Sequence, residues 1–178
     1  MAKAIGTGVT VPDFRHIAHH SLFEIHWQSN IFNAEQMFVS MAIIEVEIEI
    51  NATVDKVWDV VSDIDSEPKF WKGTKEIKNL SKDGNTINRE ITIAFRDQKC
   101  LQEVRFEPKK KIEAKFTKGI INGEKIISLI PKDEKTILHA FWDIKLTGMM
   151  GMFTGMIKKH IKSGTEQAMQ SIKEEIER

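Results

Sequence analysis

The chain has 178 residues, enough for one domain with a hydrophobic core of its own. Lys plus Arg and Asp plus Glu number 26 each, and the resulting zero net charge argues against a dedicated nucleic-acid binder. One cysteine excludes an internal disulfide and favours a cytoplasmic location. No run of 18 apolar residues is present, so we expect no membrane-spanning helix.

The N-terminal region differs from the rest of the chain because it shows no sustained hydrophobic period. We therefore interpret residues 1–40 as an extension, an expression remnant or an over-called start, and residues 41–178 as the compact domain. His16, His19 and His20 place two histidines one helical turn apart. No cysteine or acidic ligand completes a familiar zinc pattern, so we predict no metal site.

A strand and two short helices open the compact part. Apolar and acidic residues alternate along 42–50, which predicts a strand with one buried face. Asn51 stands at the N-cap position of a helix over 52–62, whose apolar residues recur at spacings of three and four. Pro68 suits the first turn of a second short helix within 66–71.

Six further strands and one long helix follow. Because short links with turn chemistry join the strands, we expect antiparallel neighbours. The strands are expected over 74–81, 86–96, 98–107, 111–118, 121–130 and 136–147, and an amphipathic helix is expected over 150–177. This order predicts an α+β fold, a curved antiparallel sheet of about seven strands wrapped around a long C-terminal helix.

Three local patterns, in this order and spacing, resemble a known superfamily. The first runs from Ile50-Asn51-Ala52-Thr53 through Val57-Trp58 and Val61-Ser62-Asp63 to Pro68-Lys69-Phe70-Trp71, the second is Val104-Arg105-Phe106-Glu107-Pro108 followed by Ile112, and the third is Thr136-Ile137-Leu138. Together they resemble the helix-grip fold of the START/SRPBCC superfamily, which includes polyketide cyclase/dehydrase-like and coenzyme Q-binding-like proteins. The resemblance covers about 41–178 and is more specific for fold than for activity.

The resemblance implies a ligand cavity between the sheet and the C-terminal helix, with a volume of roughly 300–1,000 Å³. The leading hypothesis is binding or transport of a hydrophobic molecule, such as a lipid, an isoprenoid or quinone, or a polycycle. It needs no cofactor, nucleic acid or membrane span, although transient membrane contact stays open. One alternative is an enzyme of the polyketide cyclase/dehydrase type. Another is a protein-interaction module of the chaperone-activator type, with a filled cavity.

The predicted ligand contacts come from alternate strand positions, the second short helix and the start of the long helix. The Met- and Gly-rich run 148–156 is interpreted as a mobile gate, with a loop packed on the core as the alternative. The predicted contacts are Phe70, Trp71, Gln102, Val104, Phe116, Trp142, Met149, Met152, Phe153, Met156, Ile157 and His160.

Two residues are candidates for catalysis. Arg89 is in phase with the isoleucines of its strand and, if it faced the cavity, would bind a carboxylate or polarise a carbonyl. The phase is ambiguous, and a solvated or surface-paired arginine is the simpler interpretation. His160 would border the pocket from the long helix, and Asp143 is a third polar group. Because no pair of them has the spacing of a recognisable acid–base dyad, we favour binding over catalysis.

Overall fold

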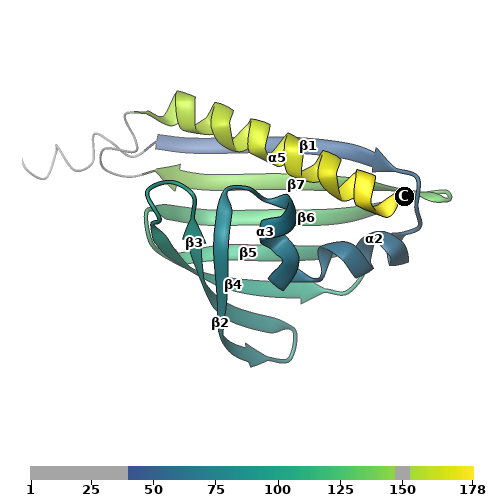
Figure 1. Ribbon diagram of the computed structural model, residues 1–178, viewed down its shortest axis with the longest axis horizontal. Helices are drawn as coiled ribbons and strands as arrows, with labels where there is room; N and C mark the ends of the chain where they lie inside the picture. The colour runs from purple at the N-terminus through teal and green to yellow at the C-terminus, as the bar shows by residue number, and fades with distance from the viewer. Residues whose placement is uncertain (1–39, 147–152) are drawn as a thin grey trace, which may run out of the picture. The chain divides into compact units, whose positions relative to one another are not determined.

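The computed structural model describes residues 40–146 and 153–178 (Figure 1). The predictions about the N-terminal extension, about its histidines, and about Met149 and Met152 therefore lie outside the described residues. The described elements, in chain order, are β1 (Ser40–Ile50), α2 (Val54–Val61), η2 (Ile64–Ser66), α3 (Glu67–Phe70), β2 (Thr74–Asp83), β3 (Thr86–Ile93), β4 (Lys99–Glu107), β5 (Lys111–Lys118), β6 (Ile121–Lys132), β7 (Lys135–Leu146) and α5 (Thr154–Ile176).

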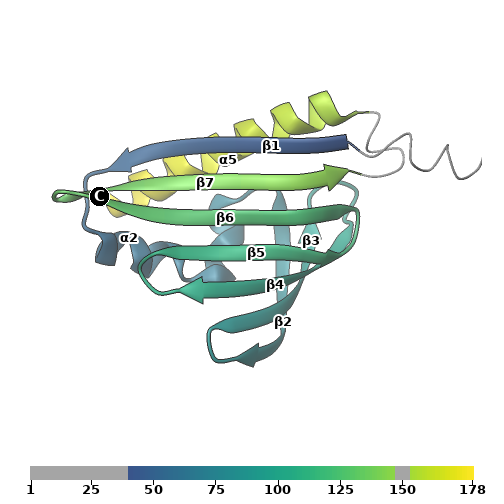
Figure 2. The same ribbon diagram turned by 180° about the vertical axis from the view of Figure 1, so that it is seen from behind.

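The seven described strands form one antiparallel sheet in the order β1-β7-β6-β5-β4-β3-β2. From β2 to β7, each strand pairs with the next strand along the chain. β1 forms one edge of the sheet and pairs with β7, from Ser40 opposite Leu146 to Ile50 opposite Thr136. The helices lie on one face of this sheet, as the views from both sides show (Figures 1 and 2). The arrangement confirms the predicted helix-grip fold, with α5 across the sheet and the short helices after β1.

Alternation along the strands sets which face is buried. Ala42 and Ile44 of β1 are buried under α5, whereas Ile43, Glu45 and Glu47 on the opposite phase of the strand are exposed. At Gly123 of β6 the backbone has a φ of 123°, and a Cβ there would lie 2.1 Å from the carbonyl oxygen of Asp143. Glycine is therefore required where β6 approaches β7 most closely.

The start of α2 corrects one expectation. The helix begins at Val54 with Thr53 as its N-cap, so Asn51 does not cap it. The backbone N–H of Asn51 instead donates to Glu177 Oε1 beyond the end of α5, over 2.7 Å. Asp55 does lie in the first turn of α2, where it complements the helix dipole, and Val57 is buried.

The C-terminal half of α5 packs on the sheet and on α2 through an apolar cluster. Its fully buried members are Ile50, Val57, Leu138, Ala140, Ala168 and Met169, with Ile172 nearly so. Gly164 is exposed with nothing near the position of a Cβ, whereas the neighbouring Thr165 is buried. The helix turns its small and apolar residues toward β1 and β7 and leaves its charges outside.

Candidate functional site

A pocket lies on the concave face of the sheet, beneath the short helices and the C-terminal part of α5. Its volume is about 30 Å³, far below the expected 300–1,000 Å³, so the expectation of a large cavity is wrong for this pocket. The reason is that side chains fill the space where a ligand was expected. The lining residues are Val60, Val61, Asp63, Ile64, Glu67, Phe70, Trp71, Arg89, Ile112, Ala114, Lys125, Ile127 and Ile172.

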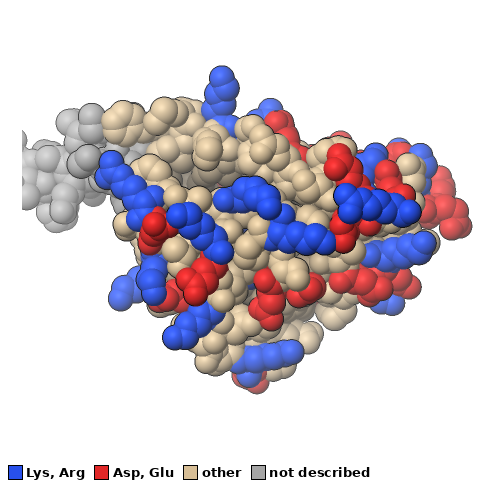
Figure 3. Space-filling model, in the orientation of Figure 1, with Lys and Arg blue, Asp and Glu red and all other residues tan. Residues whose placement is uncertain are grey.

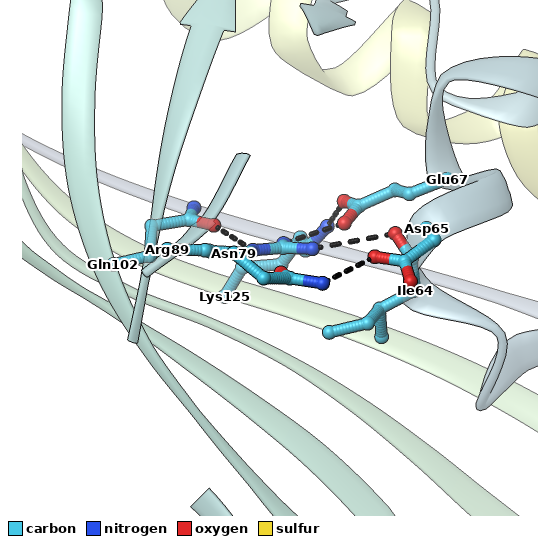
Figure 4. A network of polar contacts seen from close by, with 7 residues as sticks. All are labelled: Ile64, Asp65, Glu67, Asn79, Arg89, Gln102 and Lys125. Atoms are coloured by element: carbon cyan, nitrogen blue, oxygen red, sulfur yellow. Dashed lines mark hydrogen bonds and ion pairs between the residues drawn. The ribbon is translucent and has the colours of Figure 1, made fainter. Parts of the chain in front are cut away.

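Three ionisable side chains meet in the wall of this pocket (Figure 4). Arg89 is 1% exposed, Lys125 is 6% exposed and Glu67 is 9% exposed. Arg89 Nη2 donates to Glu67 Oε2 over 2.5 Å, and Lys125 Nζ donates to Glu67 Oε1. We call these three residues the buried ionic cluster.

Arg89 is the hub of the hydrogen bonds around this cluster. Its Nε donates to Gln102 Oε1 over 2.9 Å, and its Nη1 lies 3.4 Å from the carbonyl oxygen of Ile64. The simpler interpretation of a solvated or surface-paired arginine is therefore wrong. The side chain faces the concave side of the sheet in phase with Ile91, and a carboxylate from α3 neutralises its charge.

The sheet order explains how residues so distant in sequence come together. Arg89 lies on β3 and Lys125 on β6, with β4 and β5 between them. The β5 residue opposite Lys125 is Ala114, whose small side chain leaves room for the lysine to reach across. Glu67 begins α3, which follows the single turn of η2, and approaches both cations from above the sheet.

Aromatic rings surround the lysine. Lys125 Nζ lies 4.2 Å from the ring centroid of Trp71 and 5.5 Å from that of Trp142. The two indoles make an edge contact at 6.2 Å, and Phe116 stacks on Trp142 at 6.4 Å. Ring faces attract a desolvated ammonium group, so these contacts offset part of the cost of burying Lys125.

For both Glu67 and Lys125, burial and the oppositely charged neighbour shift the pKa in opposite directions. For Glu67, burial alone raises the pKa, but Lys125 and Arg89 together outweigh it and lower the pKa from 4.5 to about 2. For Lys125, burial lowers the pKa below its usual 10.5, Arg89 adds to this, and Glu67 opposes it. Glu67 is thus an ionised acceptor at neutral pH, and Lys125 is a donor whose proton is held less tightly than usual.

The structure brings together part of the predicted ligand set. Phe70 and Trp71 line the pocket, and Gln102 bonds to Arg89. Trp142 lies beside the lysine, and Phe116 stacks on Trp142. Val104 is fully buried in a neighbouring cluster with Ile64 and Ala114, and Ile157 of α5 packs against the cluster that contains Ile144.

The predicted contacts on the first turns of α5 lie elsewhere. Phe153 is 51% exposed, Met156 is 68% exposed, and His160 is exposed as well. None of these three is among the residues that line the pocket, and Asp143 lies opposite Glu124 on the strand phase away from it. Of the two catalytic candidates, Arg89 lines the pocket and His160 does not.

Glu67 and Lys125 are the two site residues that the sequence reasoning missed. Glu67 precedes a proline at a helix start and looks like an ordinary first-turn acid. Lys125 interrupts an otherwise apolar phase of β6, Ile121, Gly123, Ile127 and Leu129, and this interruption was the available signal. A charged residue on the buried phase of a strand requires a partner of opposite charge, and the partner of Lys125 is distant in the sequence.

The fold and this pocket define a helix-grip domain. The chain belongs to the polyketide cyclase/dehydrase and lipid transport family, whose model matches residues 41–177. The search of functionally curated proteins found no match. No helix in the described part of the chain is long and apolar enough to cross a membrane, and residues 40–146 and 153–178 contain no group of three or more potential metal ligands.

Solved structures share the fold at low sequence identity. The Zhui aromatase/cyclase from a Streptomyces species is similar at 15% identity and a TM-score of 0.68, over 78% of this chain and 95% of that one. A START superfamily protein from Mycobacterium smegmatis has 16% identity and a TM-score of 0.63, over 76% and 97%. Norcoclaurine synthase from Thalictrum flavum has 13% identity and a TM-score of 0.59, over 99% and 98%.

Proposed function

We propose that the protein binds and carries a hydrophobic small molecule, such as a lipid, an isoprenoid or a polycycle, between the concave face of the sheet and its covering helices. The observation that supports this most is the buried ionic cluster in an otherwise apolar pocket wall. Buried ion pairs add little net stability compared with apolar packing, so their presence suggests a role other than holding the fold.

The pocket must widen before such a ligand can enter. Its upper wall consists of α2, η2 and α3, segments of eight, three and four residues, whereas its lower wall is the continuous sheet. Short helices are held mainly by their tertiary contacts. We propose that the η2–α3 segment moves away from the sheet on binding while the sheet stays fixed. We also propose a cytoplasmic location, since Cys100 is free and buried.

Binding is tested first with Nile red, a neutral apolar dye that makes no assumption about ligand charge. We expect saturable binding with one dye per chain and displacement by the small molecules extracted from the purified protein. Ala114→Leu would narrow the pocket and weaken binding at least tenfold. Ala140→Leu is the matched control, because Ala140 is equally buried but belongs to the packed apolar cluster. Equal dye affinity in both variants and the unaltered protein would contradict the proposal.

Catalysis is the second candidate function, favoured by one observation. Glu67 and Lys125 place an ionised carboxylate and a lysine of lowered pKa against each other inside the pocket, a pairing suited to proton transfer. An enzyme predicts that Lys125→Met abolishes turnover of a bound polyketide-like substrate. If no dye binds and no turnover is found, the closed pocket favours the interaction module instead.

A further inference from the structure

The buried ionic cluster carries more positive than negative charge. It contains two cations, Arg89 and Lys125, and one anion, Glu67, so its net charge is +1 when all three are ionised. Asp63 also lines the pocket, but it is exposed, so water screens its charge. An unbalanced charge in a buried site is costly unless a partner of opposite sign joins it.

The two cations differ in how firmly the chain holds them and in what surrounds them. All three guanidinium nitrogens of Arg89 are held by acceptors of the chain, Gln102, Ile64 and Glu67, which use three of its five N–H donors. Lys125 Nζ has three N–H donors and makes one hydrogen bond within the described part of the chain. The other two donors have aromatic rings near them, and rings are weaker acceptors than oxygen.

A second unused donor stands beside the lysine. Trp142 Nε1 is buried and, among the buried side-chain nitrogen and oxygen atoms of residues 40–146 and 153–178, is the one without a hydrogen-bond partner. Lys125 and Trp142 are direct partners in the β6–β7 register, so their side chains project from the same face of the sheet. Buried donors without acceptors are rare in folded proteins, so this N–H group is suited to an acceptor that the described chain does not supply.

Together these observations indicate a ligand group that accepts hydrogen bonds and carries a single negative charge. A carboxylate has two oxygens, so one can accept from the ammonium group of Lys125 and one from the indole N–H of Trp142. Its charge of −1 matches the surplus of the cluster, whereas a dianionic phosphate would exceed it. Apart from the exposed Asp63, apolar residues line the rest of the pocket, so the remainder of the ligand is apolar.

We propose that Lys125 and Trp142 form a carboxylate subsite and that the ligand is a hydrophobic monocarboxylic acid. This inference rests on the proposed function, because it names the class of ligand that the same pocket takes. The aromatic rings of Trp71 and Phe116 hold the lysine and the indole in place, and the ligand carboxylate completes their hydrogen bonds.

The test compares acids with alcohols of the same carbon skeleton, titrated into the full chain by calorimetry at pH 7. The pairs are decanoate with 1-decanol and 2-naphthoate with 2-naphthalenemethanol, and decyl phosphate serves as a dianion. We expect each acid to bind at least tenfold more tightly than its alcohol, as hydrogen bonds between charged groups warrant. We expect the phosphate to bind no better than the alcohol.

Two variants test which residues cause the preference for acids over alcohols, and each variant has a matched control. Lys125→Met keeps an apolar stem and should abolish the preference for the acid, whereas Lys115→Met on the exposed face of β5 should leave it intact. Trp142→Phe keeps an aromatic ring but removes the indole N–H, so the preference for the acid over the alcohol should fall several-fold. Trp58→Phe, at an indole that packs against Phe106 rather than beside Lys125, should retain it.

Failure of this inference is distinguishable from failure of the proposed function. Equal binding of acids and alcohols would overturn the carboxylate subsite while leaving hydrophobic binding in place. Retention of the full preference in Lys125→Met or in Trp142→Phe would overturn it too, because the donors would then lie elsewhere. If neither the ligand pairs nor Nile red binds, the proposed function itself fails.

Discussion

The concave face of the sheet has two regions of different composition. Under the C-terminal half of α5, Ile50, Leu138 and Met169 pack as a continuous apolar cluster. Toward β3, beneath α3, Arg89 and Lys125 occupy the same face as buried cations. Both regions are almost fully desolvated, so burial alone does not distinguish them. The apolar region needs only volume and shape, whereas the charged region needs specific partners, and this difference separates scaffold from site.

The molecular surface on the side of α5 is not divided into a charged and an apolar region in this way. Acidic and basic side chains are interspersed over the face that carries α5 (Figure 3). Exposed pairs such as Lys69 with Glu175 at 2.6 Å and Lys132 with Glu49 at 2.8 Å contribute little to stability. The charges with structural consequences are therefore the buried ones.

The largest effect is expected from removing the one anion of the charged region. Glu67→Leu would leave Arg89 and Lys125 as two buried cations without a counter-charge, at a cost of about 3–5 kcal/mol in the free energy of unfolding. Chemical denaturation measures this. Glu175→Leu, which breaks an exposed pair, should cost less than about 1 kcal/mol. Equal costs would show that the buried cluster behaves like a surface pair.

Truncation in the apolar region should have a comparable but simpler effect. Leu138→Ala removes a fully buried side chain and should lower the free energy of unfolding by about 2–5 kcal/mol. Nile red affinity per folded chain should stay unchanged, because Leu138 does not line the pocket. Ile43→Ala on the exposed face of β1 is the control and should change stability little. A large loss of dye affinity in Leu138→Ala would remove the distinction between the two regions.

Acid should weaken the charged region selectively. The pKa of Glu67 is depressed from 4.5 to about 2, so its contribution is complete above pH 4.5 and is lost as pH falls through about 2. Glu49, exposed beside Lys132 and Lys135, has a pKa lowered similarly, but 1 M salt should screen that effect. Denaturation between pH 5 and pH 2 in high salt should therefore show a slope that disappears in Glu67→Gln. A slope that persists there would assign it to other carboxylates.

The smallest stability effect is expected at the residue most important for binding. Lys125→Met removes the surplus charge and leaves Glu67 paired with Arg89, so stability should change by less than about 1 kcal/mol. Binding of decanoate should nevertheless fall at least tenfold. A loss of stability as large as that of Glu67→Leu would mean that Lys125 holds the fold together, and the site would then have a structural role.

The sequence allowed the scaffold to be predicted in more detail than the site. Alternation and turn residues gave all seven strands close to their observed bounds, because these signals are local. The site depends on contacts that no local period encodes: Glu67 is 22 residues from Arg89 and 58 from Lys125. Arg89 was correctly placed on the apolar phase of β3, but without a visible partner it looked like a surface residue.

The remaining difference between the prediction and the structure is the volume of the cavity. Helix-grip topology predicted a large cavity, but topology fixes the course of the backbone and not how far side chains fill the space between elements. Here Trp71, Lys125 and Ile172 occupy the position where a ligand was expected. The site therefore has to be understood from its charges and unused donors, which depend on register and burial.

The central claim, that the charged region is a binding site and the apolar region is scaffold, is tested most directly by NMR of the indole N–H groups. Trp142 and Trp71 lie beside Lys125, whereas Trp58 packs against Phe106 in a different cluster. Signals are assigned with single Trp→Phe variants and followed while decanoate is added. The account predicts a saturable downfield shift of the Trp142 signal, a smaller shift for Trp71 and none for Trp58. An unchanged Trp142 signal at saturating decanoate, or equal shifts at all three indoles, would contradict it.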